Sequence, residues 1–139
     1  MANDSIWENA YLEGLEFEWD FSYDENDMNS FGEMIQDKNP LHTDNKFAKS
    51  RGFESKVVYG LLIASQTSRL IGEELPDKNS ILTGLTIDFF NPSYINRSLT
   101  FKAKLIYKSN AAKALEFSYR VLEKDKLLCK GSVKGIWRG

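Results

Sequence analysis

The order of hydrophobic patterns along the 139-residue chain predicts an α+β fold, with an antiparallel sheet wrapped around one helix. A segment that alternates apolar and polar residues stands near the amino terminus. Helical segments follow, and one of them is apolar on every side at its start. Four further alternating segments fill the carboxyl-terminal half. A sheet that must bury one face, together with one very apolar helix, favours a sheet that curls around that helix.

The first third of the chain is predicted to form one strand and short helices. Residues 15–21 alternate strictly, so their odd-numbered side chains share one face. Ser22 or Asp24 can cap a helix that runs through Ile35. The apolar side of that helix consists of Phe31, Met34 and Ile35. Pro40 disfavours helix at the residue before it, so the chain turns there, and a short helix over 45–49 follows.

Residues 57–75 are predicted to form the central helix. The segment opens with VVYGLLIA, which is apolar all round and typical of a buried helix. After Pro76, residues 81–90, 99–108, 115–121 and 127–137 alternate as strands. These strands and the first one make an antiparallel five-stranded sheet wrapped around a long central helix, which is the hotdog arrangement. The sequence contains no repeat or linker, so residues 1–139 are predicted to be a single domain.

Composition and charge argue against several classes of function. The formal net charge of −2 offers no basic face for nucleic acid. Cys129 is the only cysteine, so no internal disulfide can form, which fits a reducing compartment. The amino terminus lacks the apolar core of a signal peptide, and the longest apolar stretch, 57–64, is too short to cross a bilayer. A cytoplasmic protein without a membrane partner is therefore expected.

The stretch QDKNPLHTD over residues 36–44 contains the chemically most informative residues. His42 is the only histidine, which makes it the natural group for proton transfer near neutral pH. Asp37 cannot share a helical face with it, but the turn at Asn39-Pro40 can point both side chains at one small volume. A carboxylate and an imidazole around one water form a device that activates this water. In the alternative interpretation, His42 is a solvated loop histidine and Asp37 a charge at a helix end.

The start of the central helix offers a second candidate site at Val58-Tyr59-Gly60-Leu61. The free N–H groups at a helix amino terminus suit a developing oxyanion. Glycine there would let a substrate carbonyl approach the amide without a Cβ in the way. The alternative is that Gly60 only allows close packing of helix and sheet.

Residues 37–76 read DKNPLHTDNKFAKSRGFESKVVYGLLIASQTSRLIGEELP. This stretch resembles the signature of the R-specific enoyl-CoA hydratases, or MaoC-like dehydratases. That signature reads D-x-N-P-L-H-x-D, then F-A, G-F and H-G-[ML], then a run ending in L-I-G-x-x-L-P. The resemblance covers residues 31–92 well and the later strands by pattern. Because many positions agree in order and spacing, it favours the catalytic interpretation of the candidates above.

The resemblance implies a hydro-lyase that acts on acyl thioesters. The family's catalytic aspartate and histidine fall on Asp37 and His42, and the glycine whose amide polarises the thioester carbonyl falls on Gly60. The pair would hold a water that adds to a trans-2-enoyl thioester to give a (3R)-hydroxyacyl thioester, or catalyse the reverse dehydration. Substrate-binding positions are further predicted at Ser68, Tyr59 and Asn39.

The resemblance also implies an acyl-CoA or acyl carrier protein thioester as substrate and a homodimer or higher homo-oligomer with the site between subunits. It implies no metal and no redox cofactor, and the sequence shows none of the usual metal-ligand spacings. One alternative is a hotdog thioesterase, which would need a carboxylate on or near the central helix, where residues 57–68 offer none. Another is a hotdog protein that binds an acyl group or a partner without catalysis, although both Asp37 and His42 are retained.

Two stretches depart from the family pattern. Tyr59-Gly60 stands where the family usually has His-Gly, and a tyrosine cannot act as a base near neutral pH. Residues 92–97 replace the family's common Gly-Asp turn.

Two other sets are interpreted without a catalytic role. Trp7, Trp19 and Trp137 are expected in the core or an interface. A loose basic set near the site is expected to be solvated, with attraction to CoA phosphates or an acidic carrier protein as the alternative; it consists of Lys46, Lys49, Arg51 and Lys56.

Overall fold

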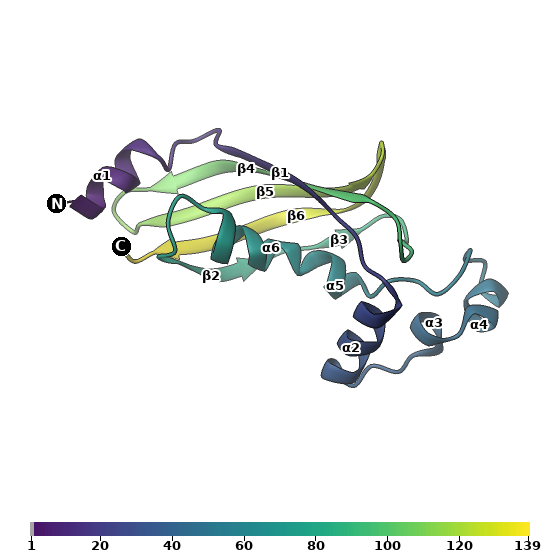
Figure 1. Cartoon of the computed structure of the whole chain (residues 1–139). Helices are drawn as coiled ribbons and strands as arrows, with labels where there is room; N and C mark the ends of the chain where they lie inside the picture. Colours follow the sequence, from purple (N-terminus) through teal and green to yellow (C-terminus); the bar gives the residue numbers. More distant parts are fainter. Residues whose placement is uncertain (1) are drawn as a thin grey trace.

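The computed structural model describes residues 2–139, so Met1, the first residue of the predicted domain, lies outside the described residues. Helices and short helical segments occupy the first half of the chain, interrupted by one strand (Figure 1). They are α1 (Ala2–Asn9), β1 (Glu16–Phe21), α2 (Glu25–Ile35), α3 (Pro40–Thr43), α4 (Asn45–Ser50), α5 (Gly60–Ala64), α6 (Gln66–Arg69) and the wider turn η1 (Leu70–Glu74). Strands follow: β2 (Ser80–Leu85), β3 (Asp88–Phe89), β4 (Leu99–Ser109), β5 (Ala114–Glu123) and β6 (Lys126–Trp137).

The strands form one antiparallel sheet in the order β1-β4-β5-β6-β2. The predicted strand over 81–90 is interrupted, because β2 and β3 pair with different parts of β6. The backbone of Thr86 crosses close to Gly131 at the interruption: a Cβ on Gly131 would lie 1.9 Å from the Thr86 carbonyl oxygen. That oxygen accepts a hydrogen bond of 2.9 Å from the Tyr119 hydroxyl. Gly131 therefore permits the bend that divides the edge strand.

The central helical run lies across one face of the sheet, as the hotdog prediction requires (Figure 1). Side chains alternate between buried and more exposed along β4 and β5, because successive residues of a strand point to opposite faces. The inward set meets the apolar side of the helix in one core cluster. Its strand members include Leu99, Phe101, Leu105, Leu115, Phe117, Tyr119 and Val121, and its helix members include Ile63, Leu70 and Ile71.

The central helix is shorter and less uniformly buried than predicted. It begins at Gly60 rather than at residue 57, and it divides near Ser65 into α5 and α6 before the wider turn η1. The hydroxyls of Ser65 and Thr67 donate to the carbonyls of Leu62 and Ala64, three residues earlier. Such bonds compete with the regular helix ladder and bend helices. One helical stripe faces outward and consists of Leu61, Ser65, Ser68 and Gly72.

Helix α2 begins at Glu25, so Asp24, one of the two capping residues that the sequence offered, is its cap. The Asp24 side chain accepts from the Asp27 backbone N–H, and the Asp27 side chain accepts in return from Asp24. The predicted apolar side is only partly right, because Met34 is 79% exposed and Ile35 is also exposed. Helix α2 instead buries Met28 and Gly32.

Replacing Phe101 by alanine is expected to lower the free energy of unfolding by about 3–5 kcal/mol. Its ring is fully buried and stacks on Trp19 and Tyr119, with centroid distances of 4.6 and 5.7 Å. A urea titration of the variant measures this loss. Tyr107→Ala on the same strand is the matched control, because Tyr107 is largely exposed and its loss should cost about 0.5 kcal/mol or less. Equal losses in both variants would contradict the assignment of the core.

Candidate active site

The loop between α2 and α3 contains Asp37, and α3 itself contains His42, so both predicted catalytic side chains lie in one short segment. Helix α2 ends at Gln36, whose left-handed backbone (φ 58°) reverses the chain, and the Asp37 N–H donates to the Gly32 carbonyl at 3.1 Å. Asn39 then caps α3 by accepting from the Leu41 N–H at 2.9 Å, and Pro40 occupies the first helical position. The turn predicted at Asn39-Pro40 is therefore a helix cap, which places His42 on the first turn of α3.

The Asp37 carboxylate is held from its own loop. Its Oδ1 accepts from the Asn39 backbone N–H at 3.0 Å. The side chain is only half-buried, so its second oxygen can accept from a water. Asn39 does not reach outward through its side-chain oxygen, because that atom is used in the cap of α3.

His42 is oriented by a backbone carbonyl from a distant part of the chain. Its Nδ1 lies 2.7 Å from the Val57 carbonyl oxygen. A carbonyl oxygen can only accept, so Nδ1 bears the hydrogen and Nε2 of the neutral ring presents a lone pair. The geometry assigns Nε2 as the nitrogen that can take a proton.

Tyr59 contacts both of these residues from the start of α5. Its hydroxyl donates to the Asp37 backbone carbonyl at 2.6 Å. Its ring stacks on the His42 imidazole with a centroid distance of 4.1 Å and an angle of 26° between the planes. Burial, reinforced by the negative charge of Asp37, raises the pKa of the Tyr59 phenol, so the hydroxyl stays protonated and acts as a donor.

A mostly apolar cavity of about 290 Å³ opens beside His42 and Gly60. Gly60 is the first residue of α5, and no described residue accepts a hydrogen bond from its N–H. The bare side of Gly60 faces the Phe89 ring: a Cβ there would lie 2.8 Å from Phe89 Cζ. The remaining wall includes Phe53, Val58, Ile63, Phe90, Leu128 and Cys129.

A histidine beside an apolar cavity with a free amide suits proton transfer next to a polarised carbonyl. The family model for the MaoC like domain matches residues 8–125 of this chain. The chain belongs to the MaoC-like family.

Two of the enzymes that are similar in sequence to this MaoC-like chain are a hydratase and a dehydratase. One is the (R)-specific enoyl-CoA hydratase of Aeromonas caviae, 37% identical over 76 residues, which cover 55% of this chain and 57% of that enzyme. The other is the mitochondrial 3-hydroxyacyl-[acyl-carrier-protein] dehydratase of Arabidopsis thaliana, 33% identical over 69 residues, which cover 50% of this chain and 40% of that enzyme. The chain thus spans about half the length of the curated relatives it matches.

A solved structure confirms the hotdog prediction. The structure of the (R)-hydratase from A. caviae involved in PHA biosynthesis has a TM-score of 0.88 at 24% identity, over 94% of this chain and 99% of that one. At this identity the similarity establishes the fold.

Within residues 2–139, no helix is long and apolar enough to span a bilayer.

Ser68 and the basic set lie outside the cavity that His42 and Gly60 line. Ser68 lies on the exposed stripe of α6 and lines no described cavity, so its role in substrate binding stays a prediction. The basic set divides: Lys56 forms an ion pair with Glu25, Arg51 lies over the Phe47 ring at 4.5 Å, and Lys46 and Lys49 are exposed.

The aromatic wall of the cavity was not predicted. Phe89 and Phe90 were assigned to a strand, and nothing in their alternation distinguishes a pocket wall from a sheet face. Cys129 also lines the cavity, and its burial raises the pKa of the thiol to about 11. The thiol is therefore protonated near neutral pH and is a packing group, not a nucleophile.

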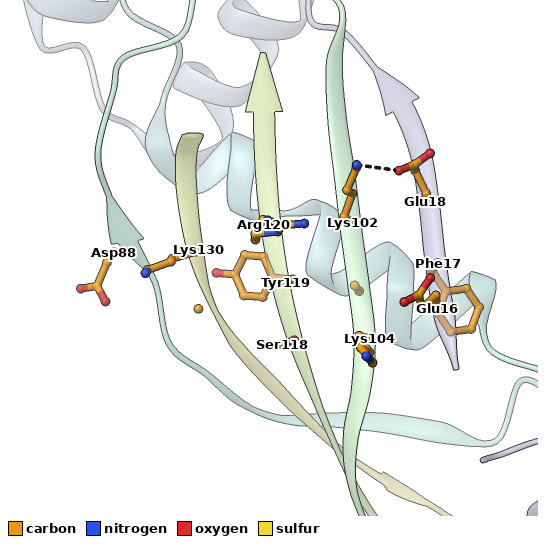
Figure 2. Close-up of a pocket in the computed structure, with 12 residues that line it drawn as sticks. Glu16, Phe17, Glu18, Asp88, Lys102, Lys104, Ser118, Tyr119, Arg120 and Lys130 are labelled. Carbon is orange, nitrogen blue, oxygen red and sulfur yellow. Dashed lines mark ion pairs between the residues drawn. The ribbon is translucent and has the colours of Figure 1, made fainter. Parts of the chain in front are cut away.

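A larger hollow lies on the outer face of the sheet and is separate from these residues (Figure 2). It has a volume of about 720 Å³, and its walls are charged side chains on neighbouring strands. Lys102, Arg120 and Lys130 stand opposite one another across β4, β5 and β6, while Glu18 pairs with Lys102 at 3.2 Å. Asp37, His42 and Gly60 do not line this hollow, whereas His42 and Gly60 line the smaller cavity, which is therefore the candidate site; Asp37 is not among the residues that line it.

Proposed function

We propose that this MaoC-like protein adds water to trans-2-enoyl thioesters to give (3R)-hydroxyacyl thioesters, or catalyses the reverse dehydration. The observation that carries the proposal is that His42, whose Nδ1 lies against the Val57 carbonyl so that Nε2 is left for proton transfer, lines the same apolar cavity as Gly60, whose N–H has no acceptor among the described residues. The names of the two relatives, a hydratase and a dehydratase, support the same reaction class.

In the proposed mechanism, Asp37 and His42 hold one water between the carboxylate and Nε2. Nε2 accepts a proton from the water while the water oxygen bonds to C3 of the enoyl group. Electrons of the double bond move toward the thioester carbonyl, whose oxygen accepts a hydrogen bond from the Gly60 N–H. The pair then returns a proton to C2, so that the net change is OH on C3 and H on C2.

The test is a panel of trans-2-enoyl thioesters from crotonyl to dodecenoyl, each on CoA and on acyl carrier protein. Loss of the enoyl absorbance measures hydration, and chiral separation of the product measures its configuration. The proposal expects (3R) product on at least one carrier. A panel without turnover in either direction would refute it, and a pure (3S) product would refute its stereochemistry.

A thioesterase activity is the competing enzyme reaction, and the same panel measures it through release of free thiol. It is disfavoured because α5 and α6 carry no carboxylate, and the first acids of the central helical run are Glu73 and Glu74 at its far end. A binding protein without catalysis would release no thiol and consume no enoyl group.

A homodimer is part of the proposal, with its interface at the edge formed by β2 and β3. Among the strands of residues 2–139, neither edge of the sheet has a partner strand, but the two edges differ in chemistry. Edge β1 exposes Glu16, Glu18 and Asp20, whose charges oppose pairing with a second copy. The β2–β3 edge instead exposes Ile81, Leu82, Leu85, Phe89 and Phe90. Because Phe89 and Phe90 also line the cavity, a partner at this edge would sit beside the site.

Sedimentation is expected to give at least twice the 15.9 kDa mass of one chain. A Leu85→Glu, Leu61→Glu double variant should shift the protein to a monomer, because it places charge on the exposed apolar edge and the adjacent helix stripe. Ile106→Glu is the matched control, since Ile106 is similarly exposed on β4, in the interior of the sheet. A wild-type monomer would contradict the dimer, and a monomeric Ile106→Glu would contradict the chosen edge.

A further inference from the structure

Tyr59 touches both members of the predicted catalytic pair from another element, and Asn39 bonds to both from within their own segment. Asp37 and His42 form no hydrogen bond with each other among the described contacts, so their relative placement depends on neighbours. Tyr59 supplies a hydrogen bond to the Asp37 carbonyl and a stacked ring under the His42 imidazole. The Phe31 ring packs edge-on against Tyr59 at 5.2 Å, and the tyrosine is only 3% exposed. These contacts hold the Tyr59 side chain in one position, from which it can position Asp37 and His42.

Gly32 leaves room for the Tyr59 hydroxyl because it has no side chain. A Cβ built on Gly32 would lie 2.4 Å from Tyr59 Oη, a distance at which one of the two must move. Gly32 lies inside α2, where alanine is ordinarily the better residue, so the glycine is explained by this contact. The Gly32 carbonyl also accepts the Asp37 N–H. Both backbone groups of Asp37 are thus bound, one by Gly32 and one by Tyr59.

These contacts bear on catalysis because the pair must hold one water within a narrow geometry. A misplacement of about 1 Å can cost roughly 10²-fold in rate. The Asp37 carbonyl lies in a loop just after a left-handed residue, and among the described hydrogen bonds it accepts only the one from the Tyr59 hydroxyl. The bond from His42 Nδ1 to Val57 sets the tautomer but leaves the tilt of the ring free, and the stacked tyrosine limits that tilt.

We propose that Tyr59, seated on Gly32, is a positioning residue that sets the distance and orientation between Asp37 and His42. The proposal rests on the proposed function for its activity readout. Tyr59 transfers no proton in this role. It occupies the place where the family usually has a histidine, so this chain orients its pair through a phenol and a matching glycine.

The test is a double-mutant cycle of Gly32→Ala and Tyr59→Phe, measured as kcat and KM on the best thioester of the panel. Tyr59→Phe removes one hydrogen bond and should lower kcat by about fivefold to tenfold with KM nearly unchanged. Gly32→Ala alone displaces the hydroxyl and should lower kcat by at least as much. Because Tyr59→Phe removes the atom that collides, Gly32→Ala should cost little more in that background.

Two further variants define the role more closely. Tyr59→Leu also removes the stacked ring and should lower kcat by about 10²-fold. Tyr59→His restores the family's usual residue and should keep substantial activity. A Tyr59→Phe enzyme as inactive as His42→Ala would overturn the proposal, because Tyr59 would then take part in the chemistry. Independent, additive losses from Gly32→Ala and Tyr59→Phe would overturn it as well.

Amide hydrogen exchange gives a readout that needs no substrate. The N–H groups of Asp37 and His42 donate to Gly32 and Asn39, and both should exchange faster in Tyr59→Leu than in the wild type. Faster exchange in a protein without hydratase activity would leave the positioning role intact and refute only the proposed reaction. Normal activity and unchanged exchange in Tyr59→Leu would refute the positioning role alone.

Discussion

Asp37→Asn and His42→Ala are each expected to lose nearly all hydratase activity while the protein stays folded. General acid–base groups contribute about 10²–10⁴-fold each, and both groups act on one water in the proposed mechanism. The asparagine keeps a side-chain oxygen that can accept from the Asn39 N–H, so the loop should survive the loss of the charge. The double variant should be scarcely worse than either single one, because groups that act as a unit are not additive.

The fold of these variants needs its own controls. His42→Ala removes the bond to Val57 and the stack on Tyr59, so His42→Asn is added because its amide can still donate to the Val57 carbonyl. Thr43→Ala changes the exposed next residue of the same helix and should keep wild-type activity. Urea titrations of Asp37→Asn, His42→Ala, His42→Asn and Thr43→Ala show whether a loss of activity comes from unfolding or from loss of the reacting group. A single variant that keeps more than about a tenth of wild-type activity would show that its residue is not essential to proton transfer.

The elements with a strong local signal were predictable from the sequence. Strict alternation identified β1, since a period of two places one set of side chains inside. The capping box at Asp24 set the first residue of α2. The sequence predicted a turn at Asn39-Pro40 between Asp37 and His42, and the structure adds its physical form, a left-handed residue followed by the cap of α3, on which His42 lies.

The features that depend on contacts between distant residues were not predictable in the same way. The bend between β2 and β3 exists because Gly131, more than 40 residues later, lets the Thr86 backbone pass. The tautomer of His42 depends on the Val57 carbonyl, which no spacing rule connects with it. Helix α1 was not predicted, although Trp7 and Tyr11 pack on Trp137 at the other end of the chain, with centroid distances of 5.4 and 6.3 Å.

The exposed stripe of the central helix consists of Leu61, Ser65, Ser68 and Gly72. An outward stripe beside an exposed apolar edge is consistent with a second copy covering both. Ser68 would then meet the partner rather than its own cavity, and the sedimentation experiment bears on this placement.

The two interpretations of Gly60, oxyanion amide and packing glycine, predict different results for Gly60→Ala. The new Cβ would lie 2.8 and 2.9 Å from Cζ and Cε1 of Phe89, so the ring must shift in either case. Phe89 is 53% exposed in the single chain, where its ring can move outward, whereas a partner at the proposed dimer edge would resist that movement. If Gly60 keeps open the approach of the thioester carbonyl to its N–H, activity should fall by about 10²-fold or more, as for the loss of one oxyanion donor.

The double variant Gly60→Ala, Phe89→Ala separates these interpretations, with Phe89→Ala alone as its matched control. Removing the Phe89 ring relieves the collision with the new methyl group, so a packing glycine would no longer matter. For an oxyanion glycine, the methyl group still stands between the amide and the substrate carbonyl, and the double variant should stay about 10²-fold below Phe89→Ala in kcat/KM. Both proteins should unfold at similar urea concentrations, because alanine is accepted at a helical position. If the double variant instead matches Phe89→Ala in kcat/KM, the Gly60 amide has no part in polarising the thioester, and the oxyanion donor must be sought elsewhere along the cavity wall.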